Sequence, residues 1–316
     1  ARFAVVEGAG DWRGVGTVET ASAPSFEAAA ARIIAQLGKP PRSAIVDAAG
    51  PVHDRRIALT NAAWVLDAGA IARALGFDAA LLLNDFEALA LALPHLPRSA
   101  TASIGPLGLA SHGTRLVLGP GTGLGAAAVV ERPGGYLALP SEAGHIDFGP
   151  ANDREAALWP LLERCDGRLT AECVLAGPGL PRLYRGLCRL DGKAAAAAIT
   201  SRAIVSAALE GADATAREAA LILLRGIARL AGDLALVTSA TGGVAIAGGM
   251  AQRLSPLIDH ADFRRQFEAK APFGDFMRGL PTVILTSEVP AFAGLAAVAR
   301  APERHLLDAG ERIARA

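Results

Sequence analysis

Short apolar runs alternate with longer amphipathic stretches along this chain, and that alternation predicts strands interleaved with helices in an α/β fold. The expected N-terminal elements are a hairpin at 2–7 and 12–21, a helix capped by Ser25 that ends at 37, a strand at 43–48, a helix capped by Asp67 that ends at 75, and a strand at 79–83. Asn84 and Asp85 follow that last strand, and a helix is expected at 86–93. Ligands bind at the carboxyl ends of strands in open α/β sheets, although on this stretch alone Asp85 is best interpreted as a helix cap.

A second block of elements begins after the Gly- and Ser-containing segment 100–113. The expected elements are strands at 114–118, 126–131 and 136–139, helices at 153–165, 199–209 and 214–236, strands at 244–247 and 282–286, and a closing helix from Pro290. Residues 4–7 and 128–131 both read AVVE, and each is followed by a glycine turn, an aromatic residue and another strand. A duplicated α/β unit is therefore expected, and the second copy predicts that a strand and a glycine-rich loop precede Ala1.

The composition favours a small-molecule ligand. A chain of 316 residues exceeds the usual size of one hydrophobic core, so two domains with a ligand site in the cleft between them are expected. The formal net charge is zero and both signs are interspersed, which predicts neither nucleic acid nor a membrane as partner. Cys165, Cys173 and Cys188 fit neither a disulfide framework nor a zinc knuckle. No apolar run is long enough for a membrane helix and no targeting segment is visible, so a cytoplasmic protein is expected.

Three polar or glycine-rich segments carry candidate chemistry. The turn at 119–125 joins two strands, so it is neither a Rossmann fingerprint nor a P-loop; its glycines suit either a phosphate-binding hairpin or an ordinary tight one. Glu142 and His145 suit hydrogen bonds to substrate hydroxyls, or form a local pair on the surface. Glu172 is a further candidate acceptor, although on its own an acidic residue in the first turn of a helix is the favoured interpretation.

Taken together, five segments resemble bacterial glucokinases of the non-ROK group in order and spacing across essentially the whole chain. They are LNDF at 83–86, GPGTGLG at 119–125, SEAGHIDF at 141–148, TAECVLAGPG at 170–179 and GGVAIAGG at 242–249. The resemblance implies an actin-like, hexokinase-type fold of the ribonuclease H-like class. It also implies a small domain at 1–95 plus 288–316, a large domain at 96–287, and a sugar held in the cleft between them.

The same resemblance implies a role for individual residues. The implied sugar contacts are Asn84, Glu142, His145, Glu172 and, from the TNAAW segment at 60–64, Asn61. Asp85 is implied to be the general base that takes the proton of the 6-hydroxyl as that oxygen attacks the γ-phosphorus of ATP. The implied nucleotide-binding residues are Gly119, Gly121, Thr122 and Gly123 for the phosphates, with Gly248 and Gly249 for the adenosine. MgATP and glucose are the implied ligands, and a homodimer is the implied assembly.

The chain departs from the family pattern at its N-terminus. A first phosphate loop of the form Asp-x-Gly-Gly-Thr-Asn, whose Asp would help to place Mg²⁺, is expected just before Ala1. The sequence leaves open whether the protein has this loop or is a truncated form. No cysteine lies between His145 and Cys165, unlike the zinc motif of ROK kinases, so His145 is expected to contact sugar and no metal ligand is assigned. No helix-turn-helix extension is visible, which disfavours a DNA-binding regulator.

The leading hypothesis is an ATP-dependent glucokinase that forms glucose 6-phosphate. One alternative, suggested by the missing loop, is a sugar-binding protein of the same fold without catalytic activity. Another is a kinase for a different hexose or an acylated amino sugar.

Overall fold

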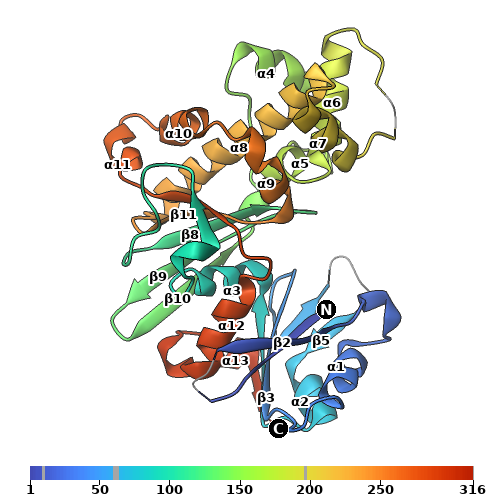
Figure 1. Ribbon diagram of the computed structural model, residues 1–316, viewed down its shortest axis with the longest axis vertical. Helices are drawn as coiled ribbons and strands as arrows, with labels where there is room; N and C mark the ends of the chain where they lie inside the picture. Colours follow the sequence, from blue (N-terminus) through green and yellow to red (C-terminus); the bar gives the residue numbers. More distant parts are fainter. Residues whose placement is uncertain (9–10, 60–63, 196–197, 316) are drawn as a thin grey trace. The chain divides into compact units, whose positions relative to one another are not determined.

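The computed structural model describes residues 1–8, 11–59, 64–195 and 198–315 (Figure 1). The chain divides into two compact units. The first comprises Ala1–Leu96, Val129–Pro140 and Glu288–Ala316, and the second comprises Pro97–Ala128 and Ser141–Ser287. Both units contain strands and helices, so the predicted α/β class is confirmed.

The first unit is built from a hairpin, a small sheet and the helices packed on them. Its strands are β1 (Arg2–Val6), β2 (Trp12–Thr17), β3 (Ser43–Ala48), β4 (Arg56–Ala58), β5 (Val65–Asp67), β6 (Ala79–Asn84) and β13 (Ile313–Arg315). Its helices are α1 (Phe26–Ile34), α2 (Ala68–Leu75), α3 (Asp85–Ala92), α12 (Ala291–Arg300) and α13 (Ala309–Arg312). Among the described residues, β13, β6 and β3 form a sheet in that order, β1 pairs antiparallel with β2, and α12 packs against α3.

Local signals explain the central part of this unit. Asp67 caps α2 by accepting a 2.8 Å hydrogen bond from the N–H of Ala70, and Gly76 ends the helix with φ +69°. The strand that follows, β6, has a buried leucine run. It pairs in parallel with β3 so that Ala48 lies opposite Asn84, which brings the carboxyl ends of two strands together.

The second unit contains a larger sheet with helices around it. The strands of this sheet are β7 (Thr101–Ser103), β8 (Arg115–Pro120), β9 (Leu124–Arg132), β10 (Gly135–Ser141), β11 (Gly243–Ile246) and β12 (Thr282–Leu285). Strand β9 passes into the first unit at Val129, and β10 belongs to the first unit up to Pro140. The helices of the second unit are α4 (Asp153–Leu158), α5 (Ala171–Leu175), α6 (Gly179–Leu190), α7 (Ser201–Glu210), α8 (Ala214–Thr238), α9 (Gly249–Leu254), α10 (His260–Glu268) and α11 (Gly274–Arg278). Among the described residues the strand order is β10-β9-β8-β11-β12-β7, with β11 parallel to both β8 and β12.

The long helix α8 supplies much of the core of the second unit. It packs against α6, α7 and α10 (Figure 1), and many of its alanine and leucine residues are buried. Asp213 caps its first turn, as Asx residues commonly do, and Ser239 ends it in the left-handed conformation. The sequence predicted this helix at 214–236, close to its observed bounds.

One helical prediction for the second unit was wrong, and α6 was not predicted. The helix expected at 153–165 ends at Leu158, where a short 3₁₀ turn, Trp159–Leu161, contains Pro160. Proline removes a backbone donor and clashes with the preceding turn, so the helix does not continue. Conversely, α6 was missed because Gly177, Pro178 and Gly179 looked like a break, although its buried residues Leu180, Leu183 and Leu187 have helical spacing.

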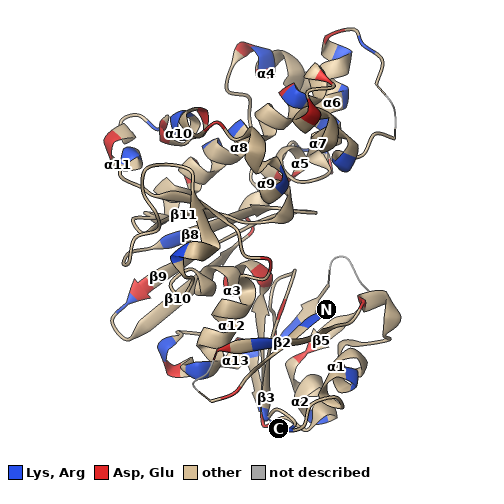
Figure 2. Cartoon of the chain, in the orientation of Figure 1, with Lys and Arg blue, Asp and Glu red and all other residues tan. Residues whose placement is uncertain are grey.

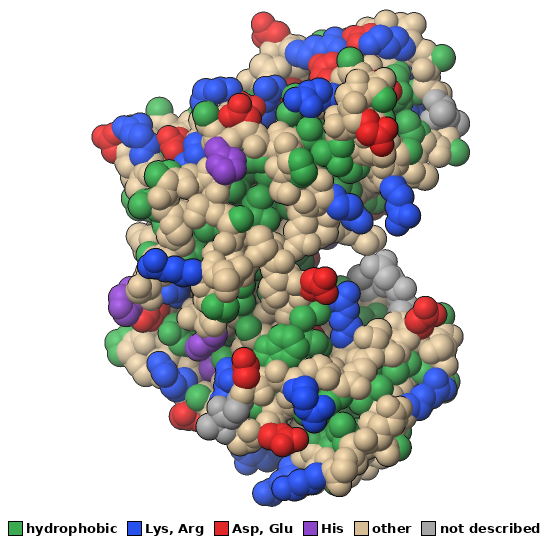
Figure 3. All heavy atoms as spheres, viewed as in Figure 1, with side chains coloured by type: hydrophobic (Ala, Val, Ile, Leu, Met, Phe, Trp, Pro, Cys, Tyr) green, Lys and Arg blue, Asp and Glu red, His purple; other side chains and the backbone are tan. Residues whose placement is uncertain are grey.

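The surface carries no dominant charge sign in the views available. Figure 2 shows basic and acidic segments beside one another on α4, α10 and α11. On the face drawn in Figure 3, hydrophobic side chains lie in small groups between charged ones. Within the described ranges, the structure has no helix with the length and apolar character that crossing a membrane requires.

Candidate active site

The turn at Asn84 and Asp85 joins β6 to α3 in the first unit. Asn84 is the N-cap of α3, and its Oδ1 accepts hydrogen bonds from the N–H groups of Phe86 (3.0 Å) and Glu87 (3.3 Å). Its Nδ2 donates to the carbonyl of Gly50 at 3.1 Å. Asp85 is the first residue of α3, and its Oδ1 accepts from the N–H of Phe86 at 2.9 Å. The interpretation of Asp85 as the helix cap is therefore corrected, because Asn84 does the capping.

A buried glutamate supports this turn. The Glu87 side chain accepts a 3.3 Å hydrogen bond from the N–H of Asn84, which completes a reciprocal capping box. Glu87 is only 1 % exposed, and its carboxylate is paired with Arg312 of α13. Sequence reasoning missed Glu87, although an Asn followed three residues later by Glu before an apolar run is a recognisable N-terminal signature.

A second carboxyl, Asp47, lies at the end of the neighbouring strand β3. It precedes Ala48, the register partner of Asn84, and its side chain is half-buried. The pKa of Asp47 is raised to about 6. The main cause is its burial away from water, and the second is the negative charge of Asp85. Asp47 was not predicted as a site residue, because only the parallel pairing of β3 with β6 brings it near Asp85.

The glycine turn of the second unit is held by Glu172. Strand β8 ends at Pro120 and β9 begins at Leu124, so the turn itself is residues 121–123, closed by a 2.8 Å hydrogen bond from the N–H of Gly121 to the carbonyl of Gly123. Oε2 of Glu172 accepts the N–H of Leu124 at 2.8 Å. A Cβ at position 123 would lie 2.5 Å from that oxygen, so a larger residue there would displace the Glu172 carboxylate from the turn. Glu172 lies in the first turn of α5, as its alternative interpretation expected.

Glu142 precedes the 3₁₀ turn Ala143–His145 that follows β10, and His145 is the last residue of that turn. Their Oε2 and Nε2 atoms are 3.9 Å apart, and both side chains are exposed, by 70 % and 58 %. Gly144, between them, packs so closely on the carbonyl of Leu124 that a Cβ there would clash. Because the N–H of Leu124 is bound by Glu172, this contact brings all three predicted sugar-binding residues of the second unit to the same end of β9.

Two further glycine segments meet the end of β8. Gly248 follows β11 with φ +92°, and a Cβ there would lie 2.5 Å from the carbonyl of Pro120. The N–H of Gly177 donates to the carbonyl of Gly121 at 2.8 Å. The predicted nucleotide segments, 119–123 and 248–249, thus converge at the carboxyl ends of the parallel strands β8 and β11. Loops rich in glycine at that edge let an anion approach backbone N–H groups. The N–H groups of Gly121 and Gly177 are used inside the turn, so Gly177 shapes the loop; the sequence did not indicate this residue.

The remaining predicted site residue, Asn61, lies outside the described residues. The three cysteines are free; Cys165 is half-buried, and its sulfur lies 2.6 Å from that of the buried Cys173.

Comparison with known proteins shows similarity to glucokinases. The family model described as Glucokinase matches residues 1–302. A glucokinase of Sinorhizobium medicae is 40 % identical over 304 residues, which cover 96 % of this chain and 89 % of the relative. The crystal structure of a glucokinase from an Antarctic psychrotroph is similar, with a TM-score of 0.84, 26 % identity and 94 % coverage of both chains.

A more distant solved structure shares the fold. It is a ROK family glucokinase from Streptomyces griseus in complex with glucose and AMPPNP, with a TM-score of 0.55, 19 % identity, and coverage of 91 % of this chain and 90 % of that one. These similarities confirm the predicted actin-like, hexokinase-type fold. With a match to its family model over nearly the whole length, the chain belongs to the glucokinase family.

Proposed function

We propose that this member of the glucokinase family transfers the γ-phosphoryl group of ATP to the 6-hydroxyl of glucose. The observation that carries the proposal is the position of Asp85, a carboxylate fixed at the carboxyl end of β6 and at the first turn of α3. Phosphoryl transfer needs little covalent chemistry from a protein, and positioning of the attacking hydroxyl is its main demand.

Asp85 is proposed as the general base. Its Oδ1 receives the N–H of Phe86, which fixes the direction of the carboxylate, and the capping box of Asn84 fixes the backbone beside it. In this role Asp85 accepts the proton of the 6-hydroxyl while that oxygen bonds to the γ-phosphorus and ADP leaves. A carboxylate within hydrogen-bond reach typically contributes about 10²–10⁴-fold to such a proton transfer.

The hydroxyls of the sugar are proposed to bind Asn84, Glu142, His145, Glu172 and Asn61. The side-chain Oδ1 of Asn84 caps α3, and one N–H of its Nδ2 donates to the carbonyl of Gly50. The second N–H of Nδ2 is the proposed donor to a sugar hydroxyl. Glu172 uses Oε2 for Leu124, and its other carboxylate oxygen is the proposed acceptor. The exposed Glu142 and His145 supply an acceptor and an imidazole nitrogen.

The phosphates of MgATP are proposed to bind the backbone of Gly119, Gly121, Thr122 and Gly123, with the adenosine against Gly248 and Gly249. The convergence of these segments at one strand edge supports this assignment. Mg²⁺ enters as part of the nucleotide complex, since this ion is usually held by substrate phosphates together with only one or two carboxylates. We further propose a homodimer that works in the cytoplasm, where its nucleotide is available.

Initial rates of ADP formation test the proposed function. The full-length protein is assayed with MgATP and, in separate reactions, glucose, mannose and N-acetylglucosamine. Glucose is expected to give the highest kcat/KM. Faster turnover of another sugar would assign the kinase to that sugar, and glucose binding without ADP formation would identify a non-catalytic sugar-binding protein.

A further inference from the structure

The C-terminal segment beyond the family match enters the sheet of the first unit. The glucokinase family model matches residues 1–302, whereas α13 and β13 span Ala309–Arg315. Strand β13 pairs antiparallel with β6, on the side opposite β3, with Ile313 facing Leu81 in register. The strand that leads to Asn84 therefore has a neighbour on each edge, and one of them is this segment.

Arg312 of this segment forms a buried ion pair with Glu87. Nη1 of Arg312 lies 2.5 Å from Oε2 of Glu87, and the two side chains are only 16 % and 2 % exposed. Burial raises the pKa of the Glu87 carboxyl, while Arg312 and the N–H of Asn84 act in the opposite direction. Arg312 thus supplies the counter-charge that a buried carboxylate requires.

The ion pair acts on the turn through the backbone of Asn84. The Glu87 oxygen that meets Arg312 also accepts the N–H of Asn84. Asn84 in turn holds the first amides of α3 and the carbonyl of Gly50. Asp85 is bonded directly to Asn84, so the hydrogen bonds that hold Asn84 also restrict the position of the Asp85 backbone.

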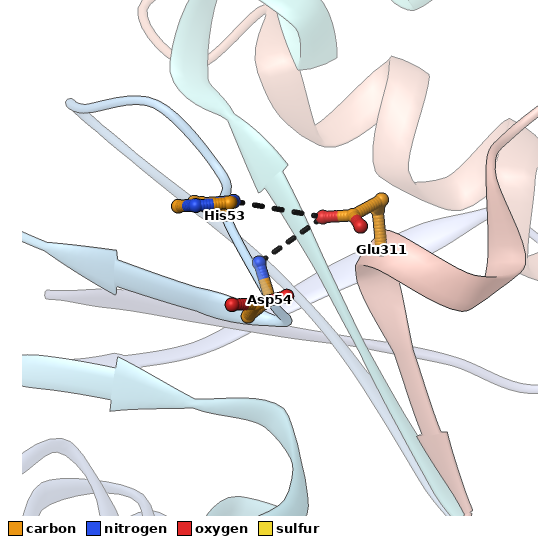
Figure 4. Close-up of side chains that lie close together, drawn as sticks. All are labelled: His53, Asp54 and Glu311. Carbon is orange, nitrogen blue, oxygen red and sulfur yellow. Dashed lines mark hydrogen bonds and ion pairs between the residues drawn. The ribbon is translucent and has the colours of Figure 1, made fainter.

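A second attachment holds the same segment in place. Oε2 of Glu311 accepts the N–H of Asp54 at 3.1 Å and lies 3.8 Å from Nδ1 of His53 (Figure 4). The carbonyl of Glu311 accepts the N–H of Arg55 at 2.8 Å. His53, Asp54 and Glu311 are close enough to share a cation, but all three are exposed and the Glu311 carboxylate is already engaged, so we assign no ion there. These contacts do not involve the Arg312 side chain, so its loss leaves the segment attached.

We propose that Arg312 and Glu87 are positioning residues, through which the C-terminal segment holds the Asn84–Asp85 turn in the geometry needed for proton transfer. The inference rests on the proposed role of Asp85 as general base. Neither residue touches the sugar in this proposal; both act through the backbone of Asn84.

Arg312→Met and Glu87→Gln test the inference in the full-length protein. Each is expected to lower kcat by about tenfold to a hundredfold, because a small displacement of a catalytic group has effects of that order, while the KM for MgATP stays unchanged. Arg312→Lys keeps the charge and is expected to recover much of the lost kcat. Hydrogen exchange of the amides at 84–92 should be faster in Arg312→Met than in the wild type.

The second unit offers a matched control. Asn152 caps α4 and accepts the N–H of Glu155 at 3.0 Å, while Glu155, only 2 % exposed, lies 3.2 Å from Arg229. The cap, the third helical residue and the buried arginine correspond to those of α3, although the Glu155 side chain accepts the N–H of Ala151 and not that of the cap. The residues that Glu155 contacts do not include a proposed ligand contact. Glu155→Gln is therefore expected to lower the melting temperature as Glu87→Gln does, but to leave kcat unchanged.

The outcomes separate the inference from the proposed function. If the wild type forms ADP and Asp85→Asn does not, unchanged kcat in both Arg312→Met and Glu87→Gln would overturn the inference alone. An equal loss of kcat in Glu155→Gln would overturn it as well, by showing a general loss of stability. Failure of the wild type to phosphorylate any sugar would instead overturn the proposed function, and the inference with it.

Discussion

Asn84 and Asp85, at the junction of β6 and α3, have different structural positions. Asn84 caps α3 with its side-chain oxygen, so Asp85 is not needed for that purpose. Asp85 instead lies in the first helical turn, where the helix dipole stabilises a negative charge. Because Asn84 provides the cap, the carboxylate of Asp85 is held at the end of β6 by the N–H of Phe86.

The role of Asp85 is tested by Asp85→Asn. The amide keeps the shape of the side chain but cannot take a proton, so turnover should fall by about 10²–10⁴-fold while glucose affinity is retained. Steady-state kinetics and a glucose titration measure the two quantities. Asp78→Asn, which alters an exposed carboxylate of the same unit, is the control and should leave turnover unchanged. Full turnover in Asp85→Asn would return this residue to a structural role.

Asp47 should make stability depend on pH in a known direction. Its pKa is raised from 3.8 to about 6 in the folded state, so the folded state binds this proton more tightly than the unfolded state. Its contribution to stability is present below about pH 4 and is lost as the pH rises to about 6. Asp47→Asn does not lose this stability as the pH rises, because the asparagine side chain does not ionise. Urea unfolding should therefore show the variant gaining stability relative to wild type between pH 4 and pH 7, and an equal difference at both pH values would contradict this.

At the scale of elements, the close packing of α12 on α3 keeps the helix that begins at Asp85 in place. Gly294 of α12 lies against the backbone of α3, so a Cβ there would clash with the carbonyl of Ala88 and would come within 2.8 Å of the N–H nitrogen of Ala92. Neither of these backbone atoms can rotate away. The contact thus depends on the absence of a side chain at one position.

Gly294→Ala is expected to lower the free energy of unfolding by about 1–3 kcal/mol, because overpacking forces two helices apart. Chemical denaturation measures the change. Gly38→Ala is the matched control, since the exposed Gly38 has open space around its Cβ position, and it should be close to neutral. Similar stability of the two variants would show that α12 and α3 are not packed this tightly.

At the scale of the whole molecule, binding of a ligand should raise the free energy of unfolding. A sugar that binds only the folded chain stabilises it by about 2.7 kcal/mol when present at a hundred times its Kd. Glucose should therefore raise the melting temperature, whereas sorbitol at the same concentration controls for the general effect of polyols. Equal shifts with glucose and sorbitol would count against a glucose site. Comparison of glucose with and without MgATP extends the test to the nucleotide.

Much of the molecule followed from local patterns in the sequence. The bounds of β3 and α2, the caps at Ser25 and Asp67, and the strands on either side of the glycine turn were predicted correctly, because caps, turns and periodicity act over a few residues. The motifs that resemble glucokinases were equally local, and the family they indicated is confirmed. Helices interrupted by proline or preceded by glycine were predicted poorly, since their local signals conflict.

Contacts between distant segments were decided only by the tertiary structure. Glu87 and Arg312 are 225 residues apart, and nothing near either one predicts the pair. Asp47 approaches Asp85 only because β3 and β6 pair in parallel, and Glu172 reaches the N–H of Leu124 only because α5 packs beside the glycine turn. A sequence determines where elements form through short-range preferences. Which elements become neighbours depends on how their apolar faces are buried together, and that sets the environment of each charged side chain.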